Sequence, residues 1–323
     1  MTHMEQSYAN NYKKGVLLTL SCYIIWGFFP IYWFPLSGVD PLQLMAQRIG
    51  WSLAFIMILL CFRKEDRLLL KDAFFNRRII VTFMASSFFL FMNWSIYLYA
   101  ISSHQVLEAS LGYYINPLVS IFLGRVFFKE ALTKVQYLAI TLAAIGVLWL
   151  ALLAGTIPYI ALLLAFSFGF YSAMKKIVAL PPLPGLFLET LFMMPFTIIY
   201  LVAVYKNGDL IFLELENLPL TLLILSGAAT TIPLLLFAKG AKYIPLSLVG
   251  ILQYVSPTLQ LLTGLFLFNE TLPPLRLIGF TIVWISVITY ISSEVHRAKN
   301  GQKRREEAEE RRLQQFSREI AGE

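Results

Sequence analysis

Apolar residues along this chain are gathered into runs of about 20, which is the length that an α-helix needs to cross the hydrocarbon core of a bilayer. Charged residues, Pro, Gly or Asn interrupt the runs, and most of the connections are short. The runs lie at 15–36, 42–62, 79–101, 105–128, 135–155, 158–176, 183–205, 219–239, 245–268 and 275–293. The pattern predicts an all-α integral membrane protein with ten transmembrane helices.

The composition supports a lipid environment for most of the chain. Of the 323 residues, 58% are apolar and 14% are charged, and the mean hydropathy is +0.69. An average soluble domain has about 25% charged residues, so an ordinary soluble protein is excluded. Cys22 and Cys61 both lie inside apolar runs, which indicates neither a disulfide framework nor a zinc site.

Basic residues alternate between the two sides of the predicted bundle. Of the 26 Lys and Arg residues, 23 fall in the N-terminus, in every second connection and in the C-terminal tail. The opposite connections hold Lys206 and Arg276, and Arg48 lies inside the second run. Because cytoplasmic loops are enriched in basic residues, we expect both termini to be cytoplasmic. This distribution is a topology signal without a basic and aromatic groove, so nucleic acid is not an expected partner.

An internal repeat occurs at an offset of 140 residues. The segment LGYYINPLVSIFLGRVFFKEAL (111–132) aligns without a gap with ILQYVSPTLQLLTGLFLFNETL (251–272). The six identities in these 22 positions are Tyr114 with Tyr254, Pro117 with Pro257, Gly124 with Gly264, Phe128 with Phe268, Glu130 with Glu270, and Leu132 with Leu272. An identical pattern with two prolines and two glutamates favours a true repeat over chance similarity between apolar helices.

The repeat spans five runs, an odd number, so the second half must enter the membrane in the opposite sense to the first. We therefore expect two five-helix inverted-topology repeats, from which many secondary transporters build a site near the middle of the membrane. The expected divisions are a cytoplasmic N-terminus (1–14), a first repeat (15–155), a second repeat (156–293) and a charged cytoplasmic tail (294–323). Charges in the tail alternate as in a solvated helix.

Three stretches resemble the EamA family of the drug/metabolite transporter superfamily, and within it the RarD-type permeases. They are GVLLTLSCYIIWGFFPIYW in the first run, NWSIYLYAISSHQVLEASLGYYINPLVSIFLG in the third and fourth, and PLSLVGILQYVSPTLQ in the ninth. The resemblance covers about residues 14–293. It implies ten transmembrane helices in two inverted halves, cytoplasmic termini and a carrier of the bacterial inner membrane.

Ionisable side chains at membrane depth are costly, which makes them functional candidates. Arg48 and Glu108 lie at comparable depth below the outer surface, so we expect an ion pair between the second and fourth spans. Such a pair either sets helix packing or binds an ionic group or coupling proton, and both interpretations stay open. Glu189 in the seventh span is the best single candidate for proton coupling, because a carboxylate shielded from lipid could take up and release a proton.

Neutral polar residues form stripes on two spans that the repeat relates. In the fourth span, Glu108, Gly112, Asn116 and Ser120 recur every four residues and so share a face, while the ninth has Gln253, Ser256, Gln260 and Thr263 on one face. We interpret the two stripes as walls of one cavity; the alternative is that they hold helices together. Trp26 and Trp94 are likewise candidates either for stacking on a solute ring or for packing.

The expected solute pathway is built from helices one to four and six to nine. Its candidate residues are Arg48, Asn93, Tyr97, Glu108, Asn116, Ser120, Glu189, Gln253, Tyr254 and Gln260. Pro117 and Pro257 are candidate hinges, because each leaves a backbone carbonyl about one turn earlier without its helical donor. The fifth and tenth spans hold hardly any strongly polar residues in their middle, which favours a peripheral position and raises the option of a homodimer contact there.

We therefore expect a secondary active transporter that moves a small organic solute, metabolite or drug by alternating access, with a coupling proton or a counter-substrate. The chain has no P-loop motif, and its three histidines lie in a terminus, an outer loop and the tail, so we expect no cofactor, no metal and no enzyme activity. The alternative is a non-transporting membrane scaffold or sensor, for which a repeat with matched polar stripes would be unnecessary.

Overall fold

The structure is a computed structural model that describes residues 3–103, 105–154, 158–269 and 272–321. This part of the chain is helical and contains no strand, as predicted. The α-helices are α1 (His3–Gly27), α2 (Phe29–Trp33), α3 (Pro41–Cys61), α4 (Lys64–Phe74), α5 (Arg77–Ser102), α6 (Val106–Phe128), α7 (Lys134–Ala154), α8 (Tyr159–Ile177), α9 (Pro182–Asn207), α10 (Asn217–Gly240), α11 (Leu246–Gln253), α12 (Val255–Leu267) and α13 (Pro274–Ala321). Two 3₁₀ turns are η1 (Phe34–Leu36) and η2 (Ile211–Leu213).

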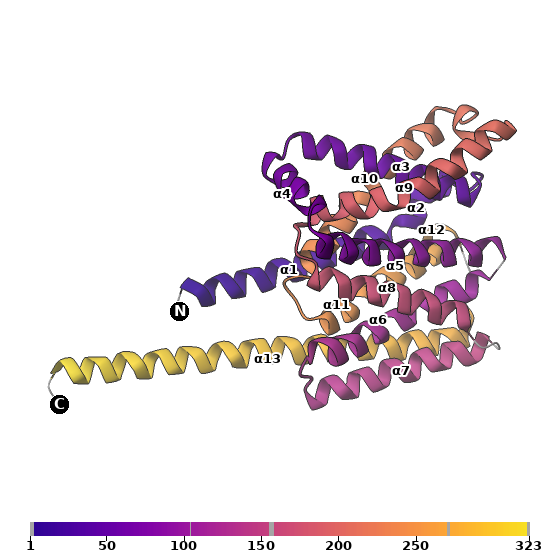
Figure 1. The fold of residues 1–323 in the computed structure, drawn as a ribbon. Helices are drawn as coiled ribbons and strands as arrows, with labels where there is room; N and C mark the ends of the chain where they lie inside the picture. The colour runs from indigo at the N-terminus through magenta and orange to yellow at the C-terminus, as the bar shows by residue number, and fades with distance from the viewer. Residues whose placement is uncertain (1–2, 104, 155–157, 270–271, 322–323) are drawn as a thin grey trace.

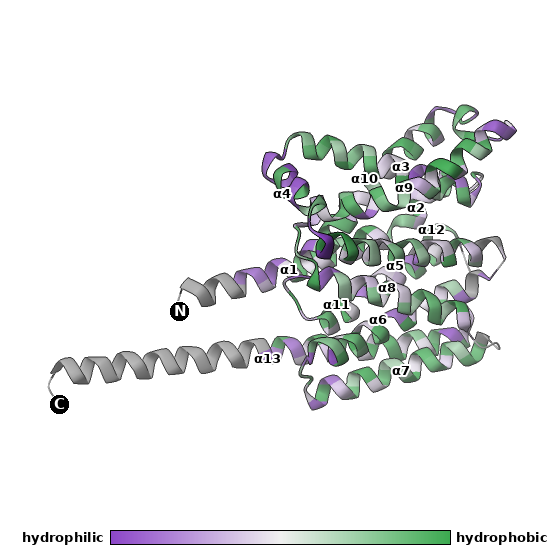
Figure 2. Ribbon diagram, in the orientation of Figure 1, coloured by the Kyte–Doolittle hydropathy of each residue, from purple (hydrophilic) through white to green (hydrophobic). Residues whose placement is uncertain are grey.

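The described helices confirm an all-α protein that spans a membrane many times. Nine segments are long and apolar enough to cross a bilayer, with α11 and α12 counted as one, and α1 with α2 supplies a tenth if that bent pair is one span. Figure 2 shows hydrophobic residues along these helices and hydrophilic residues gathered toward their ends. The apolar helices of the structure therefore coincide with the apolar runs of the sequence.

The first predicted run is a broken helix rather than a straight one. The axes of Asn10–Gly27 and Phe29–Leu36 differ by 42°. Pro30 lies in the first turn of α2, and its missing N–H cannot continue the hydrogen bonding of α1. A Cβ atom on Gly27 would lie 2.6 Å from Leu259 Cβ, so α12 packs closely against the end of α1. The break lets α2 turn its aromatic side chains toward the middle of the bundle.

The two candidate hinge prolines sit in different surroundings. The ninth span is interrupted at Tyr254, between α11 and α12, three residues before Pro257. Pro257 explains the position of the interruption, because it has no N–H to donate to the carbonyl of Gln253 four residues earlier. Pro117, its equivalent in the repeat, lies inside the continuous helix α6. Hinge roles for both residues stay predictions.

Helices that are distant in sequence pack against one another. The main pairs are α1 with α10 and α12, α3 with α9 and α10, α5 with α8 and α9, α6 with α8 and α11, and α7 with α13. When every span is exchanged for the one five places away, this set of pairs maps onto itself. The backbone turns through the left-handed region after the fourth and ninth spans, at Lys129 (φ 52°) and Asn269 (φ 53°), which are also 140 residues apart.

The fifth and tenth spans form the edge of the bundle. Figure 1 shows α7 beside the membrane part of α13, away from α3 and α9. The two helices approach closely at glycines: a Cβ atom on Gly146 would lie 2.9 Å from the carbonyl oxygen of Gly279. The peripheral position agrees with the scarcity of strongly polar residues in the middle of both spans, and a homodimer contact through them stays a prediction.

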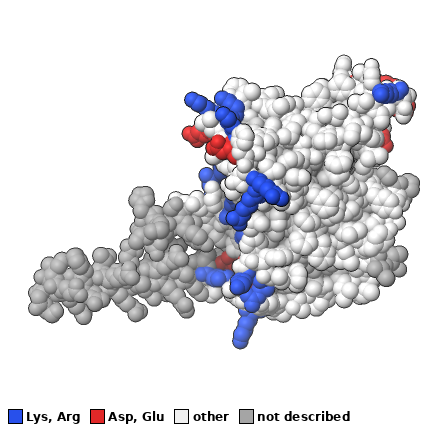
Figure 3. Space-filling model, viewed as in Figure 1, with Lys and Arg blue, Asp and Glu red and all other residues white. Residues whose placement is uncertain are grey.

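Both termini extend from the same end of the bundle, where α13 continues as one helix well beyond the other spans (Figure 1). On the face shown in Figure 3, most Lys and Arg residues gather at this end. The loop between α3 and α5 also lies here and contains α4, which has two acidic residues in its first turn. The charge asymmetry that was read from the sequence is therefore an asymmetry between the two ends of the bundle.

Glu130 joins the loop after α6 to the beginning of α11. Its carboxylate accepts hydrogen bonds from the backbone N–H groups of Leu246 (2.6 Å) and Ser247 (2.9 Å), which have no partner inside α11. Lys176 Nζ lies 3.3 Å from Glu130 Oε1 and also donates to the carbonyl of Ile244 at 2.7 Å. One carboxylate thus connects three segments of the bundle, while its repeat equivalent, Glu270, lies outside the described residues.

We expect Glu130→Ala to lower the free energy of unfolding by about 1–2 kcal/mol, because the first turn of α11 loses its cap. Glu130→Gln keeps one acceptor oxygen and should cost less. The measurement is unfolding of the detergent-solubilised protein by SDS, followed by circular dichroism. Glu65→Ala, in the first turn of the exposed helix α4, is the matched control. Equal stability of Glu130→Ala and wild type would contradict the cap.

Candidate functional site

A cavity of about 410 Å³ lies inside the bundle. Helices of seven spans line it with Tyr23, Trp26, Phe29, Pro30, Trp33, Leu44, Arg48, Asn93, Trp94, Tyr97, Gly112, Tyr113, Asn116, Leu164, Phe168, Thr230, Leu234, Gln253, Ser256, Pro257 and Gln260. Drug-sized molecules bind in pockets of about 300–1,000 Å³, so the cavity is large enough for a small organic solute. Helix α9, the seventh span, was expected to line the pathway but contributes no residue to this wall.

Arg48 brings a positive charge into this cavity. Its Nε donates to Thr230 Oγ1 at 3.2 Å, and the guanidinium lies 5.0 Å from the ring centre of Trp33 and 4.9 Å from that of Trp94. Each ring face offers a favourable cation–π contact, which is stronger in a place with little water. The side chain is therefore held between α2, α5 and α10 by neutral groups.

The ion pair expected between Arg48 and Glu108 is not formed. The carboxylate of Glu108 accepts a hydrogen bond from the backbone N–H of Ile160 at 3.3 Å, at the beginning of α8. Helix α6 packs along α8, and this turns its first polar residue away from α3. The expected equal depth in the membrane carried no information about the direction in which each side chain points.

Five of the other predicted pathway residues line the cavity: Asn93, Tyr97, Asn116, Gln253 and Gln260. Their amide groups are partly engaged, since Asn93 Nδ2 donates to the carbonyl of Leu164 at 2.9 Å and Gln260 Nε2 to that of Trp26 at 3.1 Å.

Two amide oxygens in this wall, Asn116 Oδ1 and Gln253 Oε1, are buried without a hydrogen-bond partner within the described structure. Buried polar atoms normally find a partner. Both residues belong to the cavity wall, so these two oxygens are acceptors without a partner beside the cavity.

Two predicted pathway residues, Ser120 of the stripe on α6 and Tyr254 between α11 and α12, lie outside the cavity wall. Ser120 is buried against α11, where a Cβ atom on Gly250 would lie 3.0 Å from its Cβ. Tyr254 donates its hydroxyl hydrogen to the carbonyl of Tyr114 at 3.1 Å, and the two rings lie 6.4 Å apart. At this level α6 packs directly against the ninth span, so Ser120 and Tyr254 hold helices together and do not border the cavity.

Glu189 forms a buried ion pair with Lys175. Lys175 Nζ lies 2.6 Å from both carboxylate oxygens. The side chain of Glu189 is 0% exposed and that of Lys175 is 2% exposed. Ser86 Oγ donates to Glu189 Oε1 at 2.5 Å, and the hydroxyl of Tyr171 donates to Oε2 at 3.5 Å. Four side chains from α5, α8 and α9 thus form one polar cluster inside the bundle.

Sequence reasoning missed Lys175, which was counted as a loop charge at the end of the sixth span. A signal was present, because Ser167, Tyr171 and Lys175 recur every four residues and place the lysine on the polar, protein-facing side of α8.

A small cavity of about 10 Å³, with room for about one water molecule, lies beside Glu189. Trp94, Thr230 and Leu234 line both cavities, so only a thin wall separates Glu189 from the larger one.

Lys242 adds a second positive charge near Lys175, in the turn between α10 and α11. Its Nζ donates to the carbonyl of Leu180 at 2.6 Å. Burial lowers the pKa of Lys242 below its ordinary value, and the charge of Lys175 lowers it further. Lys175 and Lys242 therefore repel each other, and the negative charge of Glu189 offsets this repulsion.

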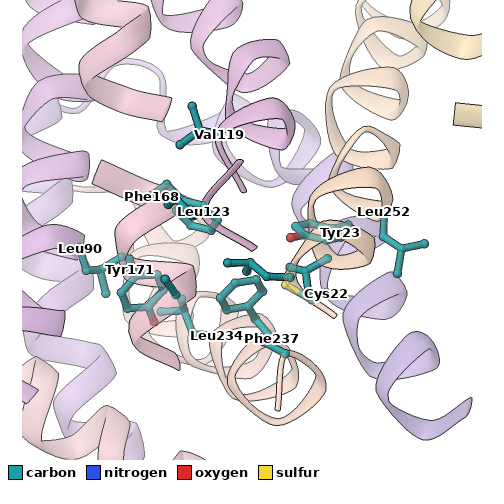
Figure 4. Close-up of a cluster of buried hydrophobic side chains, with 14 of the residues drawn as sticks. Cys22, Tyr23, Leu90, Val119, Leu123, Phe168, Tyr171, Leu234, Phe237 and Leu252 are labelled. Atoms are coloured by element: carbon teal, nitrogen blue, oxygen red, sulfur yellow. The ribbon is translucent and has the colours of Figure 1, made fainter. Parts of the chain in front are cut away.

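An apolar cluster closes the large cavity toward the end of the bundle that carries the termini. Tyr171 on α8 and Phe237 on α10 lie about one turn beyond the lining residues Phe168 and Leu234, and Cys22 on α1 lies next to the lining residue Tyr23. Figure 4 shows the side chains of Cys22, Tyr171 and Phe237 close together with Tyr23 and Leu234. The rings of Tyr171 and Phe237 stack at 6.0 Å with an angle of 12°. Access from the side of the termini would therefore require these three helices to separate.

Comparison with known proteins gives a consistent result. The model of the EamA-like transporter family matches residues 13–152 and again 156–292. Uncharacterized transporter YojE of Bacillus subtilis is 43% identical over 287 residues, which cover 88% of this chain and 95% of that protein. Protein RarD of Escherichia coli is 33% identical over 298 residues, 91% of this chain and 99% of that protein. A solved crystal structure with 14% identity has the same fold, with a TM-score of 0.62 over 86% of this chain and 97% of that one.

Proposed function

This chain belongs to the EamA-like transporter family, and from that membership we propose a secondary active transporter that moves a small organic solute across the bacterial inner membrane by alternating access. The observation that carries the proposal is the cavity of about 410 Å³, whose walls come from both halves of the chain. A scaffold needs no such space, and the match to a transporter family favours transport over sensing. Both termini are proposed to be cytoplasmic because basic residues gather at their end of the bundle.

In alternating access through inverted repeats, each half adopts in turn the conformation of the other. Several observations support such repeats at 15–155 and 156–293. The family model matches each half separately. The helix pairs map onto themselves when the halves are exchanged, and the left-handed residues Lys129 and Asn269 are 140 positions apart. The halves meet where α6 packs on α11. In the proposed cycle the apolar cluster at Tyr171 and Phe237 opens while the other end of the cavity closes.

We further propose that the ion pair of Glu189 and Lys175 couples transport to a proton. The pair lies next to the cavity, and Trp94, Thr230 and Leu234 stand between the two. Protonation of the carboxylate would remove its attraction for Lys175 and free α8 to move relative to α9. A counter-substrate is the alternative driving force, and it would leave transport independent of the pH gradient.

Purified protein in proteoliposomes is expected to move at least one solute of a metabolite library, and a pH gradient is expected to increase the flux. Glu189→Gln should reduce that flux to its level without a gradient, because the residue can no longer release a proton. Glu65→Gln, at the exposed helix α4, is the matched control. If folded protein moved no solute, the carrier function would be wrong; if Glu189→Gln kept the full gradient-driven flux, Glu189 would not be the coupling group.

A further inference from the structure

We propose that the solute is an organic anion with a planar apolar body, and that Arg48 binds its anionic group. The proposal rests on the transport function above, because it names the class of molecule that occupies the same cavity. Its starting point is the charge balance of the cavity wall, in which Arg48 is the sole charged side chain among the described residues. A cation surrounded by neutral groups at membrane depth is costly, and an anion beside it removes that cost.

The guanidinium of Arg48 has donors available for such a group. Within the described structure, its one hydrogen bond runs from Nε to Thr230 Oγ1. The two terminal nitrogens carry four further N–H donors, which match the two oxygens of a carboxylate or of a similar planar anion. The rings of Trp33 and Trp94 lie within 5.0 Å of the guanidinium carbon, and thereby restrict the orientation of the group before a solute arrives.

The buried acidic side chains Glu108 and Glu189 do not supply the missing negative charge. Glu108 is directed to the backbone N–H of Ile160, and Glu189 is paired with Lys175; neither belongs to the wall of the large cavity. A cationic solute would therefore meet Arg48 without a carboxylate to bind it. This repulsion selects against cations, and the free donors select for anions.

The remainder of the wall favours a flat apolar body. Aromatic rings from four spans line the cavity, and the pair Tyr97 and Tyr113 lie 6.0 Å apart in edge contact. Ring faces stack on planar molecules with offset geometry and contribute beyond simple burial of area. The unpartnered oxygens of Asn116 and Gln253 accept hydrogen bonds from donors elsewhere on the solute.

Four matched probes test the proposal on the wild-type full chain in nanodiscs, by isothermal titration calorimetry. They are naphthalene-2-carboxylate, its neutral carboxamide, the cationic 2-(aminomethyl)naphthalene, and the non-planar decahydronaphthalene-2-carboxylate. We expect the planar carboxylate to bind about tenfold or more tightly than the carboxamide, as for a charge-assisted hydrogen bond, and the cation and the non-planar anion to bind more weakly still. Equal or tighter binding of the carboxamide or the cation would overturn the proposal, and so would failure of all four to bind.

Variants of Arg48 separate a binding role from a packing role. Arg48→Gln should lose the preference for carboxylate over carboxamide while it keeps the affinity for the carboxamide, and Arg48→Lys should keep part of the preference. Arg63→Gln, at an exposed arginine before α4, should match the wild type. If Arg48→Gln weakened all probes equally, Arg48 would support the cavity wall and not the anion. If the variant does not fold, the probe series on the wild type still decides.

Flux measurements distinguish this proposal from the one on which it rests. Carboxylate-selective binding without movement of any solute in proteoliposomes would leave the anion site and remove the transport function. Conversely, transport of cations at equal rates in wild type and Arg48→Gln would leave the transport function and remove the anion site.

Discussion

Lys175→Met is expected to lower the free energy of unfolding by about 3–5 kcal/mol, the cost of leaving a buried charge without its partner. The variant keeps the length of the side chain and deletes the charge, so Glu189 is left with two hydroxyl donors in a place that is 0% exposed. SDS titration of the detergent-solubilised protein, followed by circular dichroism, measures the change. Lys71→Met, at an exposed position of α4, should be close to wild type.

The double variant Lys175→Met with Glu189→Met separates charge from packing. Replacing both members of a buried ion pair with apolar residues is often neutral, because the cost of removing two charges from water disappears with their attraction. We therefore expect the double variant to recover most of the stability that Lys175→Met loses. If the single variant were as stable as the wild type, the pair would be weaker than its 2.6 Å distances indicate.

Gly227→Ala is expected to cost about 2–3 kcal/mol, at the upper end of the usual cost of overpacking. A Cβ atom at this position would overlap the carbonyl group of Trp51 and lie 2.8 Å from the backbone nitrogen of Ser52. These are backbone atoms of α3, which cannot rotate away as a side chain can. The same SDS titration measures the effect, and the cavity should be affected as well, because α3 and α10 supply Arg48 and Thr230 to it.

Gly50→Ala is the matched control, since Gly50 lies one residue before Trp51 on α3 and its Cβ position has no neighbour within 4 Å. There the substitution should be neutral or should stabilise the helix by about 0.5–1 kcal/mol, because alanine loses less conformational freedom than glycine. Equal behaviour of the two variants would mean that the close contact of α3 and α10 is not required for stability.

The sequence predicted the long apolar helices because the length of an apolar run is set by the thickness of the bilayer, a constraint that applies to each helix separately. The polar stripes likewise identified faces that avoid lipid. They could not distinguish a face that borders a cavity from one that meets another helix, so Asn116 and Ser120, four residues apart on α6, have different surroundings. That distinction depends on the angle at which α6 crosses α11.

The sequence also did not predict which side chains on different helices contact each other. The sequence singled out Arg48 as an ionisable residue inside a span, but its partners are two tryptophans and a threonine on other helices. Lys175 was overlooked because a lysine at the end of an apolar run normally extends to the membrane surface. Its inward direction follows from the tight packing of α8 against α5 and α6, which the sequence of α8 alone does not contain.

Because α13 is one continuous helix, a small tilt of its membrane part produces a larger displacement of its far end. The helix runs from Pro274 to Ala321, and its candidate membrane span lies within Pro274–Arg297. The 24 residues beyond Arg297 extend about 36 Å at the rise of an α-helix, so a tilt of about 10° in the membrane part moves the far end by about 6 Å. A spectroscopic label near Ala321 would therefore magnify small rotations of the bundle edge into displacements that can be measured outside the lipid.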